Sequence, residues 1–143
     1  MSAAEAVDFS RGFAARAVER LRPARIIWLV TVRSDGLPQP VPVWFLWDGQ
    51  SFLIYSRDHQ QKLRNIRRNP QVALHLDSDG RGGNITVFSG RAELATETPP
   101  AHEVPDYLER YRDLIARNSW SPEEFAQLYS IAIRVTPTGV TGH

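Results

Sequence analysis

The sequence predicts a mainly β fold, a small β-barrel of six or seven antiparallel strands with helices attached to it. Segments rich in β-branched and aromatic residues recur along the chain, and Gly, Pro, Asp and Ser residues separate them. The turns Ser34-Asp35-Gly36 and Asp48-Gly49 are short enough to join antiparallel neighbours. Helical patterns occupy one N-terminal, one central and one late region, which fits a barrel with helical decoration.

The composition indicates one domain over residues 1–143, with 42% hydrophobic and 23% charged residues. A net charge of +1 argues against nucleic-acid and membrane partners, and the absence of cysteine excludes disulfides and thiolate metal sites. Residues 1–9 carry no secretory signal, and no apolar run approaches the roughly 20 residues that span a membrane. We therefore expect a cytoplasmic protein without a metal site.

The N-terminal region is expected to form a helix over residues 9–22. Its apolar side chains recur every four residues and would form one stripe, made of Phe9, Phe13, Ala17 and Leu21. Pro23 ends the pattern because proline cannot continue a helix. Such a helix would close one end of the barrel.

The first strands are expected over residues 26–32, 43–47 and 51–55, as an antiparallel meander. Between the first two lie the alternate prolines Pro38, Pro40 and Pro42. A proline cannot donate to a strand ladder, so this segment should be an edge strand or a strand that is interrupted where a ligand approaches.

The stretch over residues 51–70 changes character within a few residues. A buried strand ends at Ser56, and a short helix is expected to begin with Asp58 as its N-cap and to end before Asn69-Pro70. The helix carries the only lysine of the chain, Lys62, and several arginines. A helix N-terminus with such cations can bind an anion, although a solvated basic face would show the same pattern.

The second half of the chain predicts two strands, then two helices, then a last strand. The strands cover residues 72–77 and 84–95, and Ser89-Gly90 within the second indicates a bulge. A helix over residues 104–117 is followed by a capping box that begins at Ser121, with a second helix to Tyr129. The last strand covers residues 131–135, and Pro137 and Gly139 are expected to end it.

Two residues have alternative roles that the pattern alone leaves open. Trp44 has a large flat face that could cover a ligand ring or pack in the core. His75 is a conceivable base, but it lies between two leucines of a strand without a carboxylate nearby in sequence, which favours a structural histidine. No nucleophile or acid–base pair stands out, so we expect no catalytic side chain.

The order of these signals resembles the FMN-binding split-barrel family of pyridoxamine 5'-phosphate oxidase, and most closely its small branch that uses the deazaflavin coenzyme F420. Four segments carry the resemblance: residues 28–49, 52–77, 85–94 and 131–143. The family holds its flavin phosphate with a Tyr-Ser or Tyr-Thr pair and a basic dipeptide. Tyr55-Ser56 matches the first, whereas Gln61-Lys62 matches the second only at Lys62.

The resemblance implies a split barrel with F420, or alternatively FMN, at the interface of a homodimer. It implies that Ser56, Arg57, Lys62 and Arg64 hold the phosphate. The other implied cofactor contacts are Pro42, Val43, Trp44, Tyr55, Gln61 and Asn84. The C-terminal segment with which the oxidases bind their vitamin B6 substrate has no counterpart here, which argues against vitamin B6 oxidation.

The resulting hypothesis is an F420-dependent oxidoreductase that transfers a hydride between the reduced deazaflavin and a small organic acceptor. The cofactor would carry the hydride, which agrees with the lack of catalytic side chains. Arg67 and Arg68 would meet the carboxylates of the F420 tail, which FMN lacks. The alternatives are an FMN-binding oxidase or flavin reductase of the same fold, and a flavin- or F420-binding protein without turnover.

Overall fold

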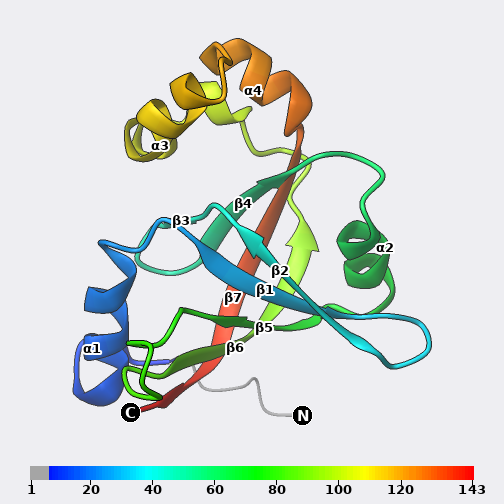
Figure 1. Ribbon diagram of the computed structural model, residues 1–143. Helices are drawn as coiled ribbons and strands as arrows, with labels where there is room; N and C mark the ends of the chain where they lie inside the picture. Colours follow the sequence, from blue (N-terminus) through cyan, green and yellow to red (C-terminus); the bar gives the residue numbers. More distant parts are fainter. Residues whose placement is uncertain (1–6) are drawn as a thin grey trace.

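One antiparallel sheet of seven strands organises the fold, in the spatial order β2-β1-β5-β6-β7-β4-β3 (Figure 1). The strands are β1 (Ile27–Val32), β2 (Pro38–Val43), β3 (Leu46–Trp47), β4 (Phe52–Ser56), β5 (Gln71–His75), β6 (Thr86–Leu94) and β7 (Ile131–Gly142). The two edge strands, β2 and β3, are consecutive in the chain, and only Trp44 and Phe45 separate them. The sheet therefore curls until its edges approach each other, which makes the predicted split barrel.

The structure is a computed structural model and describes residues 7–143. The prediction that no secretory signal is present rests on residues 1–9, most of which lie outside the described part. Over residues 7–143, no helix is both long and apolar enough to cross a membrane. In the same range, no group of His, Asp or Glu side chains is placed to hold a metal ion.

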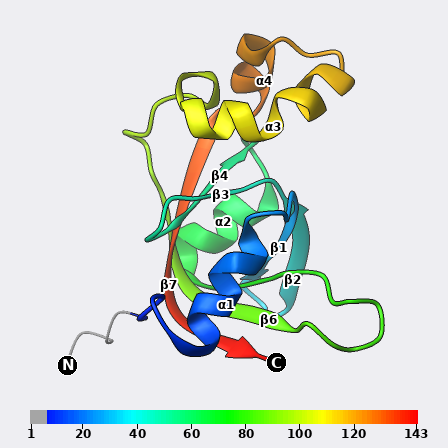
Figure 2. The same ribbon diagram turned by 90° about the vertical axis from the view of Figure 1, so that its left-hand side faces the viewer.

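The helices lie around the sheet at three places (Figures 1 and 2). They are α1 (Gly12–Leu21), α2 (Gln61–Arg68), the 3-10 helix η1 (Ala101–Glu103), α3 (Pro105–Arg117) and α4 (Pro122–Leu128). Helices α3 and α4 lie together beyond one end of the sheet, whereas α1 packs near its other end against β7. The predicted capping box at Ser121 is present and begins α4.

Strand β4 separates two hydrophobic cores, because all five of its residues are buried. Phe52 and Ile54 pack inside the barrel with residues of β1, β6 and α2. The alternate residues Leu53 and Tyr55 pack on the opposite face of the strand with α3 and α4. The end of β4 therefore lies where the barrel meets the two late helices.

Both early helices begin later than the sequence predicts, and in each case an aspartate side chain holds the preceding turn. Asp8 accepts a hydrogen bond from the Ser10 backbone N–H (2.9 Å), and α1 begins only at Gly12. Asp58 accepts from the His59 backbone N–H (2.7 Å), and His59 has a left-handed φ of 62°. The prediction of Asp58 as N-cap is therefore wrong: α2 begins at Gln61, and its N-cap is Gln60, which makes no side-chain cap.

The predicted three-strand meander is also wrong. β2 pairs with β1 and β3 pairs with β4, but β2 and β3 lie at opposite edges of the sheet. The chain leaves the ladder between Val43 and Leu46 instead of turning back on itself. The three alternate prolines lie in β2, which has a partner on one side only, so their lack of N–H groups costs no ladder bond on the free side.

The last strand continues beyond Val135, where the sequence predicts its end. It pairs with β6 as far as Gly142, and a register shift opposite Ser89-Gly90 confirms the predicted bulge. Pro137 is tolerated because β4 pairs with β7 only up to Val135, so the outer side of β7 has no ladder there. At the other end of the ladder, β6 begins at Thr86 and not at Asn84, since Asn84 has a left-handed φ of 56°.

Candidate functional site

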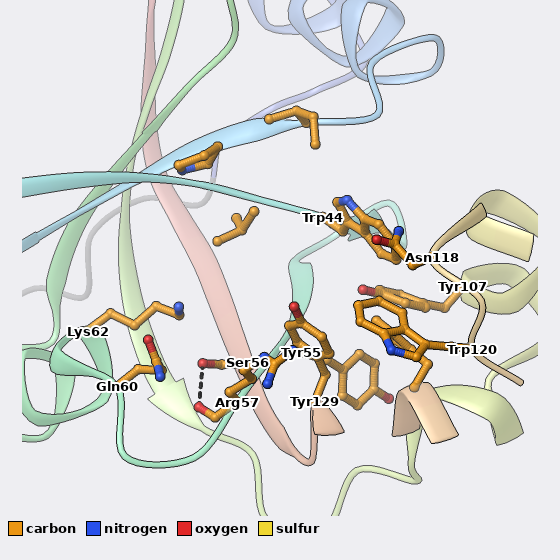
Figure 3. Close-up of a pocket in the computed structure, with 14 residues that line it drawn as sticks. Trp44, Tyr55, Ser56, Arg57, Gln60, Lys62, Tyr107, Asn118, Trp120 and Tyr129 are labelled. Carbon is orange, nitrogen blue, oxygen red and sulfur yellow. Dashed lines mark hydrogen bonds between the residues drawn. The ribbon is translucent and has the colours of Figure 1, made fainter. Parts of the chain in front are cut away.

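A pocket of about 510 Å³ opens where the end of β4, the start of α2 and the helices α3 and α4 meet (Figure 3). Its volume is in the range of small-molecule and cofactor sites. Fourteen residues line it: Ile26, Pro42, Val43, Trp44, Tyr55, Ser56, Arg57, Gln60, Lys62, Tyr107, Asn118, Trp120, Phe125 and Tyr129. None of them is a carboxylate, a histidine or a cysteine.

Lys62 marks the cationic side of the pocket. It lies in the first turn of α2, and its ammonium end points into the pocket (Figure 3). Burial lowers the pKa of Lys62 below its ordinary value. The ion pairs that join residues 7–143 do not include Lys62. A half-buried cation without a counter-charge is a favourable place for an anionic ligand.

The docking of α2 explains why Lys62 faces the pocket. Leu63 and Ile66 are almost fully buried in the barrel core, with 1% and 3% of their surface exposed. Asn65 is also buried, and its side-chain amide donates to the Thr31 hydroxyl (2.9 Å) on β1. These anchors fix the rotation of the helix about its axis, so the neighbouring Lys62 is turned toward the pocket.

Ser56 and Arg57 lie at the end of β4 and line the pocket on the same side as Lys62. The Ser56 hydroxyl is buried and donates to the Arg57 carbonyl (2.8 Å; Figure 3). The Arg57 guanidinium lies 5.0 Å from the centre of the Tyr129 ring, in a cation–π arrangement, and makes no ion pair within 4 Å among the described residues. The Arg57 guanidinium can therefore offer donors to an anion beside Lys62, whereas the single O–H donor of Ser56 is used by the Arg57 carbonyl.

Aromatic rings from α3 and α4 and from the β2–β3 connection form the opposite side of the pocket. Trp44 stacks on Tyr111, with ring centroids 4.8 Å apart and planes 2° from parallel, and on Phe125 at 5.3 Å. Trp120 and Tyr129 extend the same cluster around Phe125. Rings of this kind offer flat apolar faces to a planar ligand.

Tyr55 joins the two sides of the pocket. Its ring packs edge-on against Tyr107 at 4.9 Å, and its hydroxyl donates to the Pro99 carbonyl at 2.6 Å. Burial raises the pKa of Tyr55 to about 12. Tyr55 is therefore a neutral, fixed part of the wall at neutral pH.

The structure brings seven of the ten predicted site residues to this pocket and places three elsewhere. The seven are Pro42, Val43, Trp44, Tyr55, Ser56, Arg57 and Lys62. Gln61 and Arg64 bond to each other (2.8 Å) on the exposed side of α2, and Gln60 lines the pocket instead. Asn84 lines a separate hollow near Arg20 and Asp77.

The arginines that were expected to meet a cofactor tail lie at the far end of α2. Arg67 and Arg68 are in its last turn, and the Arg68 guanidinium donates to the Val32 carbonyl (2.9 Å). Neither residue lines the pocket. A contact with an acidic tail would therefore require the tail to leave the pocket and follow the surface of α2.

Local sequence patterns do not indicate the pocket residues that α3, α4 and the turn between them contribute. The apolar stripe of α3, which includes Tyr107 and Tyr111, predicts a packed helix face but gives no sign of a ligand. Trp120 lies in the turn between the two helices. Their meeting with Trp44 depends on the docking of the helices over β4, and no local pattern encodes that docking.

The geometry is suited to a planar molecule with an anionic group. The cationic side would hold the anion, and the aromatic side would cover the plane. No carboxylate, histidine or cysteine lines the pocket, and its residues are suited to binding, orientation and exclusion of water.

Residues 13–143 match the protein family described as "Pyridoxamine 5'-phosphate oxidase". No curated protein sequence gives a significant match to this chain. Among solved structures, a protein described as "F420 Reductase" is similar at 28% identity, with a TM-score of 0.59, over 81% of this chain and 88% of that protein.

Two further solved structures share the fold over most of their length. The conserved hypothetical protein Rv2991 of Mycobacterium tuberculosis is 26% identical, with a TM-score of 0.67, over 91% of this chain and 82% of that one. HutZ of Vibrio cholerae, described as a heme storage protein, is 16% identical, with a TM-score of 0.62, over 90% of this chain and 92% of that one. The fold therefore occurs in proteins with different ligands.

Proposed function

Since this chain belongs to the pyridoxamine 5'-phosphate oxidase family, we propose that it is an F420-dependent oxidoreductase that acts on a small organic acceptor. The observation that carries the proposal is Lys62, a half-buried cation that faces a pocket and has no ion-pair partner among the described residues. The similarity to a protein described as an F420 reductase supports the choice of cofactor.

The residues of the cationic side fit the phosphate of such a cofactor. The Lys62 ammonium and the Arg57 guanidinium would supply charge, and the Ser56 hydroxyl would donate a hydrogen bond once it turns away from the Arg57 carbonyl. The N-cap of α2, Gln60, makes no side-chain cap and lines the same pocket, and the N-terminus of a helix favours an anion. A phosphate there would compensate the charge of Lys62, for which residues 7–143 provide no ion-pair partner.

The planar ring of the cofactor would lie toward the break between β2 and β3. Pro42, Val43 and Trp44 line the pocket there, and the chain has left the sheet ladder after Val43. Backbone groups outside a ladder are available to the polar edge of a ring. Trp44 is half-buried, so part of its surface remains available to a ligand.

When bound, the reduced deazaflavin supplies the hydride. The side chains of the pocket hold it in place, orient the acceptor against it and keep water away. Tyr55 and Tyr107 contribute as neutral groups, because burial raises the pKa of both. No residue of the pocket has to act as a nucleophile.

Titration of the purified protein with F420, FMN and the phosphate-free deazaflavin chromophore tests this proposal. Trp44 and Trp120 line the pocket, so tryptophan fluorescence reports binding directly. We expect F420 to bind much more tightly than FMN, and the phosphate-free chromophore to bind more weakly than F420. Tighter binding of FMN would move the protein to the flavin-dependent alternative, and binding of neither would refute both.

Turnover separates an enzyme from a carrier. The reduced cofactor should be oxidised faster in the presence of the protein and a set of organic acceptors than in the presence of either alone. Binding of F420 without such an acceleration for any acceptor would favour the alternative of a non-catalytic binding protein.

We also propose that the protein is a cytoplasmic homodimer with the cofactor near the interface. Apolar side chains such as Leu37, 51% exposed, and Ile26, 36% exposed at the rim of the pocket, would be covered by a second copy. Light scattering on the eluted protein should give twice the mass of the 16.2 kDa chain. A monomer at micromolar concentration would contradict the dimer without affecting the cofactor assignment.

A further inference from the structure

The Tyr107 hydroxyl is a buried polar group in the wall of the pocket. Tyr107 lies on α3 with 1% of its surface exposed, and its oxygen has no hydrogen-bond partner among the described residues. The residue lines the pocket, and Figure 3 shows its hydroxyl end pointing from α3 toward the pocket interior, between Trp44 and Tyr55. A buried hydroxyl without a partner is destabilising by itself.

The next turn of the same helix shows that the fold can satisfy such a group. The Tyr111 hydroxyl accepts from the Phe45 backbone N–H (2.8 Å) and lies within hydrogen-bond distance of the Phe45 and Arg25 carbonyls. The two tyrosine rings are 5.0 Å apart. The lack of a partner is therefore specific to the position of Tyr107, the one of the two that lines the pocket.

The surroundings define the chemistry that the Tyr107 hydroxyl can recognise. Burial raises the pKa of Tyr107 well above its ordinary value, and the nearby phenols of Tyr111 and Tyr55 act in the same direction. The group therefore remains a neutral O–H donor at physiological pH. The Phe125 ring beside it is apolar, so this part of the pocket favours an uncharged, planar ligand.

We propose that Tyr107 is a substrate-binding residue that donates a hydrogen bond to the carbonyl oxygen of a planar, uncharged, conjugated acceptor such as a quinone or an enone. This inference rests on the proposed function, because it places the acceptor beside the cofactor in one pocket. The hydrogen bond draws electron density toward the oxygen and makes the conjugated carbons more electrophilic. Because the phenol oxygen is covered, contact with an acceptor requires a neighbouring side chain of the pocket to move aside.

The test compares the unsubstituted protein with Tyr107→Phe, both loaded with oxidised F420 so that no turnover occurs. The probes are menadione, a planar quinone, and methylnaphthalene, which has nearly the same shape but no acceptor oxygen. Equilibrium dialysis gives the affinity for each probe, and the fluorescence titration gives the affinity for F420. The substitution removes one oxygen atom, and the unsubstituted protein alone already reports the preference between the two probes.

We expect the unsubstituted protein to prefer menadione and Tyr107→Phe to bind menadione about three- to tenfold more weakly, with unchanged affinity for methylnaphthalene and for F420. Three outcomes would each overturn the role of Tyr107. The two proteins could bind menadione equally well, the substitution could weaken the binding of both probes equally, or the unsubstituted protein could show no preference for menadione. Failure of both proteins to bind F420 would instead refute the proposed function, which is therefore tested separately.

Discussion

Tyr107 and Tyr111 lie one turn apart on α3, with ring centroids 5.0 Å apart, but their hydroxyls have opposite surroundings. The Tyr111 hydroxyl connects α3 to the β2–β3 connection through Phe45 and to the segment before β1 through Arg25. The Tyr107 hydroxyl has no partner among the described residues and belongs to the pocket wall. One helix thus carries a tyrosine whose hydroxyl joins three segments of the fold and a tyrosine whose hydroxyl has no partner among the described residues.

Tyr111→Phe should lower the free energy of unfolding by about 1–3 kcal/mol, because the buried Phe45 backbone groups lose their partner. Tyr107→Phe is the matched comparison and should leave the free energy of unfolding unchanged or raise it, because its hydroxyl has no hydrogen bond to lose among the described residues. Urea unfolding followed by circular dichroism measures both. Equal losses in the two variants would contradict the contrast between the two hydroxyls.

Lys62→Gln should weaken binding of F420 by about 1.5–3 kcal/mol, which is the contribution of a charge-assisted hydrogen bond. The affinity for the phosphate-free deazaflavin chromophore should not change, because it has no phosphate to meet Lys62. The two titrations, followed by tryptophan fluorescence, therefore isolate the contact with the phosphate.

Arg64→Gln provides the control on the same helix. Arg64 bears the same charge, but it bonds to Gln61 on the exposed side and does not line the pocket. Its substitution should leave the F420 affinity within about twofold, since screened surface charges contribute little. A similar loss in both variants would show that α2 attracts the anion only through its general charge.

The stability of the protein should fall as the pH rises above the ordinary tyrosine pKa of about 10. Burial raises the pKa of Tyr55 to about 12 and raises the pKa of Tyr107 and Tyr111. In the unfolded chain these phenols ionise first, so the unfolded state binds fewer protons in this range and becomes favoured. The contribution of Tyr55 is complete below about pH 10 and is lost between about pH 10 and pH 12.

Lys62 acts in the opposite direction, because its pKa is lowered in the folded state. The measurement is therefore made in the Lys62→Gln background, by urea unfolding at several alkaline pH values. Tyrosinate absorbance of the native protein should also lag behind that of the unfolded chain. Identical titration curves for the two states would contradict the assigned pKa directions.

Gly90→Ala should destabilise the protein by about 1–3 kcal/mol, as overpacking of a filled site does. A Cβ at Gly90 would lie 2.6 Å from Val135 Cγ1 and 3.1 Å from the Thr136 carbonyl oxygen, on the neighbouring strand β7. Gly139→Ala, across the same bulge, is the control, because its Cβ would meet only the Ser89 hydroxyl, which can rotate away. Thermal unfolding that ranks the two variants in the reverse order would contradict this account of the bulge.

Local sequence patterns predicted most of the fold. The prolines of β2, the bulge at Ser89-Gly90 and the capping box at Ser121 all appear where they were expected, since each depends on only a few neighbouring residues. The predicted start of α2 was wrong because the Asp58 side chain accepts a hydrogen bond from the His59 backbone N–H before the helix. Other predicted boundaries were wrong because pairing with a distant strand sets where a strand ends. Pro137 did not end β7, because β6 continues to pair with that strand.

By itself, the sequence determined the existence of most strands and helices and the presence of a lone lysine beside the end of a buried strand. These features follow from side-chain size, branching and hydrogen bonding over a few residues. Only the tertiary structure decided which side chains share the pocket. Burial of Leu63 and Ile66 turns Lys62 toward the pocket and leaves Gln61 and Arg64 on the exposed side of α2. The docking of α3 over β4 brings Tyr107 to the same pocket. Such choices depend on which faces pack together, and packing joins residues that are far apart in the chain.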